Sequence, residues 1–224
     1  MEDSELITRL LDINQPMSNN PKRFSTIILS LRGARKLFGC DLVTGEYLAL
    51  EMNDENWADG TYRSFQLTGI TSYLILLEQV GSILKPKTAT KLVRSNGIFC
   101  ALKHFSSIDD IAINAIVSLR NSLTHRYGLA TEKKPKTQPP RKFTLSTDRN
   151  KLVVQLPKTD WDGTFLDKSA KTYTTIFVID LVVLVENVFK RIKVEHEEGT
   201  LKLALRDGAA ELKARYTIID EITD

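Results

Sequence analysis

The stretch SIDDIAINAIVSLRNSLTHRYG, residues 107–128, has the clearest helical pattern in the chain. Apolar residues recur in it at intervals of three and four, the spacing that places side chains on one face of an α-helix. Ser107 precedes the first apolar residue as an N-cap, and Gly128 follows the last turn, so we expect one long helix between them. The apolar residues cover most of its circumference, which predicts a helix buried in a bundle.

A narrow polar stripe remains on this predicted helix. Successive residues of a helix are rotated by about 100°, which aligns Asn114, Ser118, Asn121 and His125. The stripe contains no Lys or Glu, which is unusual for a face that simply meets water. Arg120 lies beside it, on the flank of the apolar arc, where a charged side chain requires a partner because an unpaired buried charge is costly.

Arg120 and the last two residues of the stripe resemble a known sequence signature. Arg120-Asn121, three further residues and His125 resemble the R-N-x-x-x-H motif of the HEPN superfamily. With Tyr127 the segment is similar to the R-x4-H-x-Y form of HEPN ribonuclease toxins from bacterial toxin–antitoxin pairs. The resemblance implies a mainly α fold, a HEPN-like helical bundle that dimerises and cleaves RNA without a metal. It also implies that Arg120 and His125 are catalytic and that Asn121 orients the groove.

The same resemblance implies a regulatory role for Tyr127. In some toxin pairs the tyrosine at this position is adenylylated by the antitoxin. We therefore expect RNA as the substrate, a homodimer as the active form, and a cognate antitoxin or inhibitor protein as a further partner. The biological setting that follows is that of a toxin or defence effector.

The chemistry of metal-free RNA cleavage explains why these residue types matter. The 2′-hydroxyl must lose its proton, the phosphorus acquires extra negative charge, and the departing 5′-oxygen must be protonated. His125 can perform either proton transfer, since histidine changes its charge near neutral pH. Arg120 can donate two charge-assisted hydrogen bonds to the phosphoryl oxygens. One imidazole cannot easily act as base and acid at once, so a second copy of the helix is expected, and DNA, lacking the 2′-hydroxyl, should resist cleavage.

Each residue of the motif also has a purely structural explanation. Arg120 can pair with a core acid such as Glu78 or Asp180. His125 can be a histidine whose cationic form is favoured by the C-terminal end of the helix dipole. The motif asparagine and tyrosine are then a polar plug that fixes the helix register and a core aromatic residue.

Two other functional classes follow from these explanations. The first is a non-catalytic HEPN-like module that binds a nucleotide, RNA or a protein partner, favoured if Arg120 and His125 are sequestered from any groove. The second is a nucleotidyl-handling enzyme. It lacks sequence support, because Gly33, Gly39 and Gly45 do not form a phosphate-binding loop and no paired carboxylates mark a metal site.

Composition sets the wider frame. The chain has 224 residues, of which 42% are hydrophobic and 26% charged, with a net charge of +3. One domain of this length buries a sizeable core without disulfides or metal ions. The slight excess of basic residues permits RNA binding but does not by itself indicate it. Cys40 and Cys100 lie far apart with no histidine at ligand spacing, so we expect neither metal nor cofactor. No signal peptide or membrane span is predicted, which favours a cytoplasmic protein.

The remaining pattern predicts further helices and one β-hairpin. Helical spacing marks residues 24–38, 62–84 and 172–196, and more weakly 87–104, where Gly97 interrupts good helix formers. Alternating apolar residues on both sides of a turn at 148–150 predict a β-hairpin inserted after the motif helix.

Between the motif helix and the hairpin, residues 131–142 are charged and Pro-rich, which marks an exposed loop. Cations in and near it are candidates for RNA binding: Arg126, Lys133, Lys134, Lys136, Arg141 and Lys142. We expect a single domain over residues 1–224. Its parts are a bundle core at about 20–128 and 172–196, the loop and hairpin at 131–157, and a C-terminal extension at 197–224 that forms either a second hairpin or a short helix.

Overall fold

Helices make up most of the fold in the computed structural model, which describes residues 3–12, 25–48, 61–89, 96–126, 128–131 and 139–216. The helices are α1 (Asp3–Leu11), α2 (Thr26–Phe38), α4 (Thr61–Ile83), α5 (Gly97–Phe105), α6 (Asp110–Arg126), α7 (Val178–Glu197) and α8 (Gly208–Tyr216). The mainly α class is therefore confirmed. No helix in the described ranges combines the length and apolar character needed to cross a membrane.

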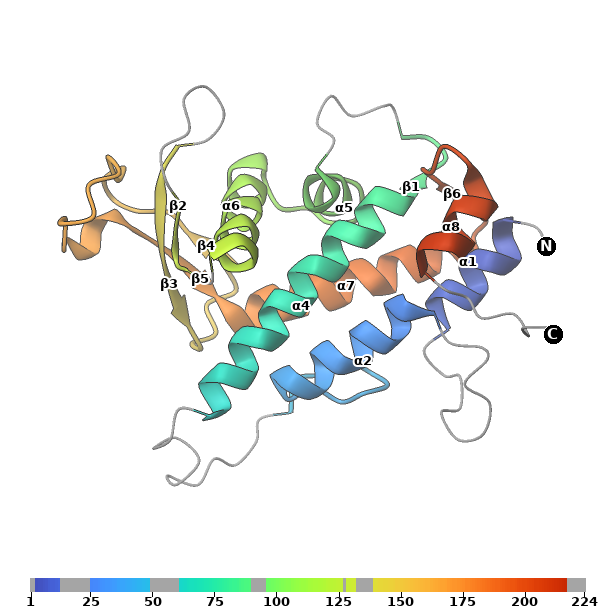
Figure 1. Ribbon diagram of the computed structural model, residues 1–224, viewed down its shortest axis with the longest axis horizontal. Coiled ribbons are helices and arrows are strands. Elements are labelled where there is room, and N and C mark those ends of the chain that lie inside the picture. The colour runs from blue at the N-terminus through green and yellow to red at the C-terminus, as the bar shows by residue number, and fades with distance from the viewer. Residues whose placement is uncertain are drawn as a thin grey trace.

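Helix α4 runs through the middle of the bundle and contacts most of the other helices, including α2, α5, α6 and α7 (Figure 1). Its contact with α5 depends on two glycines. A Cβ atom on Gly81 would lie 1.9 Å from the carbonyl oxygen of Gly97, and one on Gly97 would lie 2.0 Å from the carbonyl oxygen of Glu78. The two backbones therefore pack directly against each other near Glu78.

Helix α2 is fixed at both ends by its own sequence. The Ser25 hydroxyl accepts a hydrogen bond from the Ile28 amide at 3.1 Å and donates one to the Leu10 carbonyl at 3.0 Å. At the other end Gly39 adopts a left-handed conformation, with φ 83°, which glycine tolerates without strain. The N-cap thus joins α1 to α2, whereas the predicted start of this helix before residue 25 lies outside the described residues.

The motif helix α6 has a different N-cap from the one predicted. The Asp109 carboxylate accepts hydrogen bonds at 2.9 Å from two backbone amides of the first turn, so Asp109 and not Ser107 is the N-cap. At the other end, Arg126 is the last described residue of the helix. The Ser122 hydroxyl lies within hydrogen-bonding distance of the carbonyls of Gly128 and Ala130, at 2.7 and 2.9 Å, and so fixes the chain after the helix.

A small sheet packs beside α6. Its strands are β2 (Ala130–Thr131), β3 (Arg141–Ser146), β4 (Val154–Gln155) and β5 (Tyr173–Phe177) in the order β2-β3-β5-β4, and a separate ribbon joins β1 (Leu84–Pro86) to β6 (Leu201–Leu203). Strands β3 and β5 are parallel, and the other pairs are antiparallel.

The predicted β-hairpin is wrong. Strands β3 and β4 both form, but β5 lies between them, and Ile176 of β5 pairs with Leu145 on one side and Val154 on the other. Alternation of apolar residues identifies a strand and its buried face, but it does not identify the neighbouring strand. The segment predicted as one helix over 172–196 contains strand β5 followed by helix α7. Both elements are apolar and adjoin without a break, so the sequence pattern does not separate them.

The C-terminal part belongs to the same core as the bundle. Residues Gly208–Tyr216 form a helix and not a second hairpin, and Leu212 and Tyr216 are buried in the main core cluster. Helix α5 begins at Gly97, with Asn96 as its N-cap, so Gly97 starts this helix where the sequence pattern placed it in the interior of a longer one. The first three residues of the predicted helix, 87–89, form a turn and not a helix, and residues 90–95 lie outside the described residues.

Candidate functional site

The motif lies in the C-terminal half of α6, where α4 supplies an acid. The Arg120 side chain is only 19% exposed, and its Nη2 forms an ion pair with the carboxylate of Glu78, which is exposed to the same fraction. Arg120 Nη1 donates a hydrogen bond to Asn121 Oδ1 at 3.1 Å. The guanidinium is therefore held between a carboxylate from α4 and the amide of the next motif residue.

This ion pair is incompletely satisfied. Arg120 Nε is buried and has no hydrogen-bond partner among the described residues. The pair engages Glu78 Oε2, whereas Oε1 has no partner in the described ranges and does not belong to the fully buried polar atoms. An ion pair with unused hydrogen-bonding capacity on both sides can exchange partners at lower cost than a saturated one.

His125 is exposed and makes no hydrogen bond with the residues that the structure describes. It follows Asn121 by one turn, so the two side chains share a face of α6. Thr124 lies between them and Arg120 and donates to the Arg120 carbonyl at 2.9 Å. At about 100° per residue, these four residues occupy an arc of about 140° on α6. The cation, the amide and the imidazole thus face one side of the helix.

The structural explanation of Arg120, that it pairs with an acid of the core, is partly confirmed, because its partner is Glu78. Asp180 is not that partner: its Oδ2 accepts a hydrogen bond from the Asn150 amide at 3.0 Å. Sequence alone did not distinguish the two acids. Glu78 was therefore recognised as a candidate partner but not as a member of the site.

Lys142, predicted to bind RNA, is not available for that role. Its side chain is buried, and its Nζ lies 3.0 Å from the Asp167 carboxylate and 4.4 Å from the centre of the Tyr173 ring. Hydrogen bonds from the Ser169 amide, the Thr172 hydroxyl and Lys142 lower the pKa of Asp167 to about 2. Lys142 therefore organises the loop before β5, because its position on strand β3 turns it inward.

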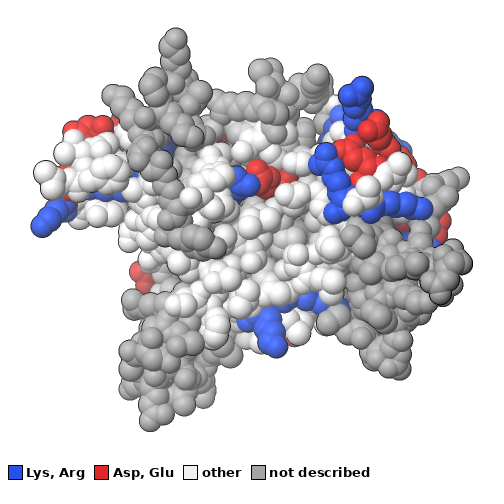
Figure 2. Space-filling view, viewed as in Figure 1, with Lys and Arg blue, Asp and Glu red and all other residues white. Residues whose placement is uncertain are grey.

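Among the other predicted RNA-binding residues, Arg141 is half-buried at the start of β3, and burial lowers the pKa of its guanidinium. The rest, like the predicted modification site, lie outside the described side chains: Arg126, Tyr127, Lys133, Lys134 and Lys136. On the face shown in Figure 2, the described residues form no broad basic patch in the middle, where blue and red atoms adjoin within a mostly white surface.

A pocket opens next to the end of the motif helix. Leu129, four residues after His125, lines a hollow of about 430 Å³. The other lining side chains come from α4, from β3 and the residue Thr147 that follows it, and from the start of α7. Its walls are largely apolar, with Gln66, Thr144 and Thr147 as polar contributors. Such a combination of apolar wall and a few hydrogen-bonding groups suits an unstacked nucleobase.

No group of three or more His, Cys, Asp or Glu side chains in the described ranges is arranged to hold a metal ion. The groups at the motif are a guanidinium, a carboxylate, an amide and an imidazole. Together they can bind an anion and move protons.

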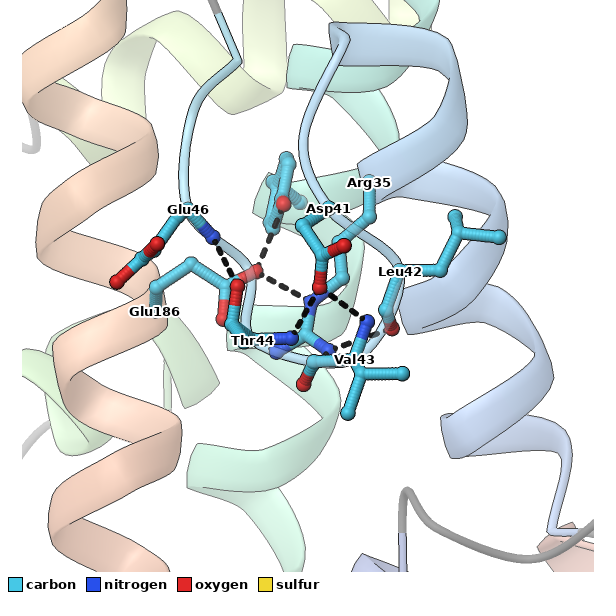
Figure 3. A network of polar contacts seen from close by, with 8 residues as sticks. Arg35, Asp41, Leu42, Val43, Thr44, Glu46 and Glu186 are labelled. Carbon is cyan, nitrogen blue, oxygen red and sulfur yellow. Dashed lines mark hydrogen bonds and ion pairs between the residues drawn. The ribbon is translucent and has the colours of Figure 1, made fainter.

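A second Arg–Glu pair, which the sequence analysis missed, lies in the bundle core (Figure 3). Arg35 Nε and Nη2 donate to the two carboxylate oxygens of Glu186 at 2.8 and 2.6 Å. Arg35 Nη1 donates to the carbonyls of Leu42 and Val43, each at 2.9 Å, and the Tyr73 hydroxyl donates to Glu186 Oε1 at 2.8 Å. The sequence signal was present, since each charge interrupts the apolar face of its helix.

The loop after α2 closes over this buried pair. Asp41 accepts hydrogen bonds from the amides of Val43 and Thr44 at 2.9 and 2.7 Å, which shapes the turn. Burial, followed by the negative charge of Glu186, raises the pKa of Tyr73, and burial raises the pKa of Cys40 to about 11. This network joins α2, α4 and α7.

No protein-family model, curated protein or solved structure matches the chain.

Proposed function

We propose that this protein is a HEPN-type endoribonuclease that cleaves RNA without a metal, through attack of the 2′-hydroxyl. The observation that carries the proposal is the arrangement on α6: Arg120 hydrogen-bonded to Asn121, with an exposed His125 one turn further on the same side. A half-buried cation and an exposed imidazole that has no hydrogen bond to the described residues are suited to bind and cleave a phosphodiester.

In this proposal Arg120 stabilises the negative charge that grows on the phosphoryl oxygens. Asn121 orients the guanidinium through its Oδ1, and His125 transfers a proton. Cleavage leaves a 2′,3′-cyclic phosphate and a 5′-hydroxyl. A homodimer would bring a second imidazole to the RNA, as the resemblance to HEPN proteins implies.

The setting remains part of the proposal. By resemblance, the protein is a cytoplasmic toxin or defence effector kept in check by an antitoxin or inhibitor protein, with Tyr127 as a candidate modification site. These features follow from the R-x4-H-x-Y resemblance of Arg120, His125 and Tyr127.

A second candidate function is a non-catalytic HEPN-like module that binds a nucleotide, RNA or a protein. The ion pair between Arg120 and Glu78 favours it, because a neutralised guanidinium attracts a phosphate less strongly. The two candidates differ in whether RNA bound at the motif is broken.

The deciding experiment incubates the purified protein with a mixed pool of tRNA and single-stranded RNA in excess EDTA. We expect cleavage with 2′,3′-cyclic phosphate ends, and a loss of about 100-fold or more with His125→Ala. His196→Ala is the matched control, since His196 contacts Thr8 at 2.8 Å on the α1–α7 side of the bundle. Intact RNA with folded wild-type protein, or equal cleavage by His125→Ala, would contradict the proposal, and binding without cleavage would favour the module.

A further inference from the structure

The motif contains one histidine per chain, but 2′-hydroxyl attack requires both a base and an acid. The structure places a second proton-transferring group at the site, the carboxylate of Glu78. We propose that Glu78 is a further catalytic residue, the general base for the 2′-hydroxyl, with His125 as the general acid. This inference rests on the proposed ribonuclease function and gives one chain a complete acid–base set.

The position of Glu78 is tightly determined. Its backbone lies where α4 and α5 are in direct contact, because a Cβ atom on Gly97 would be 2.0 Å from its carbonyl oxygen. The same carbonyl accepts a hydrogen bond from Ser82 at 2.8 Å. The side chain is then held by Arg120. A carboxylate fixed from both ends is pre-organised for proton transfer.

The ion pair also places the base next to the substrate. A phosphate that binds the Arg120 guanidinium must share it with Glu78, so the nucleotide and the carboxylate become neighbours. The cation between them reduces the repulsion of the two negative charges. Glu78 Oε1, which has no partner in the described ranges, remains as the proton acceptor.

The proposed step is balanced. Glu78 takes the proton of the 2′-hydroxyl while the 2′-oxygen forms a bond to phosphorus. The bond from phosphorus to the 5′-oxygen breaks, and the leaving oxygen takes a proton from the His125 imidazolium. The products are the cyclic phosphate and the 5′-hydroxyl, after which Glu78 returns its proton to water and His125 regains one.

A purely neutralising Glu78 makes a different prediction. Its replacement by Gln would free the positive charge of Arg120, so RNA would bind more tightly and turnover would not fall. If Glu78 is the base, Glu78→Gln retains or strengthens binding, seen as an equal or lower KM, while kcat falls by about 100-fold or more.

The test compares two dinucleotide substrates in EDTA, one with the natural 5′-oxygen and one with sulfur in its place. A thiolate leaves without an acid because its conjugate thiol is far more acidic than an alcohol. We expect His125→Ala to be slow on the oxygen substrate and restored on the sulfur substrate, and Glu78→Gln to be slow on both. The rise of rate with pH on the acidic side should disappear in Glu78→Gln. Asp110→Asn, which removes a 2.9 Å ion pair with Lys103 in the first turn of α6, is the control.

The outcomes separate the two proposals. If the wild-type protein cleaves but Glu78→Gln keeps its turnover on both substrates, the role of Glu78 is overturned and the ribonuclease function survives. If the folded wild-type protein cleaves neither substrate, both proposals fail. Should Glu78→Gln unfold, Glu78→Asp decides: a reduced rate on both substrates with the acidic-side rise retained supports the base, and a wild-type rate overturns it.

Discussion

Two arginine–glutamate pairs link helices in the described part of the chain, and they differ in how completely their hydrogen-bonding groups are satisfied. Arg35 and Glu186 are 5% and 4% exposed and meet through two hydrogen bonds, and the arginine has two further carbonyl acceptors. Arg120 and Glu78 are each 19% exposed and meet through one nitrogen and one oxygen, while Arg120 Nε is unpartnered in the described part of the chain.

The difference separates a structural pair from one suited to chemistry. Removing a charge from water is costly, and only a full set of partners compensates, as at Arg35. A partly exposed pair with unused hydrogen-bonding capacity can accept a phosphate without leaving a buried charge alone. We therefore expect substitutions at the two pairs to differ in their effect on the stability of the fold.

The largest expected effect is on the buried pair. Glu186→Gln leaves the Arg35 charge uncompensated in the core, so we expect the free energy of unfolding to fall by about 3–5 kcal/mol in urea denaturation. The control is the double variant Arg35→Met, Glu186→Leu, which removes both charges and should recover most of the loss. A loss below about 1 kcal/mol for the single variant would mean that water reaches the pair.

A smaller loss is expected from the loop over the same pair. In Gly45→Ala the new Cβ would lie 2.2 Å from Glu186 Oε2, at a residue whose φ is 73°. We expect a loss of about 1–3 kcal/mol, measured by thermal unfolding. Gly33→Ala is the matched control, because nothing lies within 4 Å of its Cβ in the interior of α2, and it should stabilise by about 0.5–1 kcal/mol. Equal effects of the two substitutions would contradict the close packing of Gly45.

The Arg120–Glu78 pair should contribute little to the stability of the fold. We expect Glu78→Gln to change the free energy of unfolding by no more than about 1 kcal/mol in urea, because water can hydrate the freed guanidinium. The Glu186→Gln variant, measured alongside, is the reference. A loss as large as that of Glu186→Gln would make the Arg120 pair structural and remove the contrast.

The smallest expected effect is local and depends on pH. Hydrogen bonds donated by the Thr44 and Val43 amides lower the pKa of Asp41 in the folded protein. The stabilisation from Asp41 is therefore fully present above its unfolded value of about 3.9 and is lost as the pH falls through the lower folded value. By NMR, the amide signals of Val43 and Thr44 should titrate below that value, and Asp41→Asn should abolish the titration. A midpoint at or above the ordinary value would show that the turn does not hold the carboxylate.

Helices α2 and α4 could be predicted well from the sequence, because the spacing of their apolar residues and the residues that end them indicate the same boundaries. Apolar residues recur at helical spacing in both, Gly39 ends the first, and Pro86 follows the second. Helix α7 was placed correctly from Val178 onward, but residues 173–177 of the predicted helix form strand β5. Thr174, Thr175 and Ile176 favour a strand, and no polar turn separates them from the helix.

The candidate site could be predicted only in part. Arg120, Asn121 and His125 are close in sequence and share one helix, so their relation follows from helical geometry. Glu78 lies 42 positions before Arg120, and the choice between it and Asp180 depends on how α4 crosses α6. Lys142 was misassigned because its buried position follows from the parallel pairing of β3 with β5, which local pattern does not reveal.

The C-terminal helix also bears on when the fold can form. The Tyr216 carbonyl accepts a hydrogen bond from the Thr26 hydroxyl, 190 positions earlier, and β6 pairs with β1 from the first half of the chain. Contacts of such long range form late, because the intervening chain must close first. During synthesis the ribosome therefore carries α6 without the finished bundle that surrounds it. The bundle around the motif helix can therefore close only after β6 and α8 have been made.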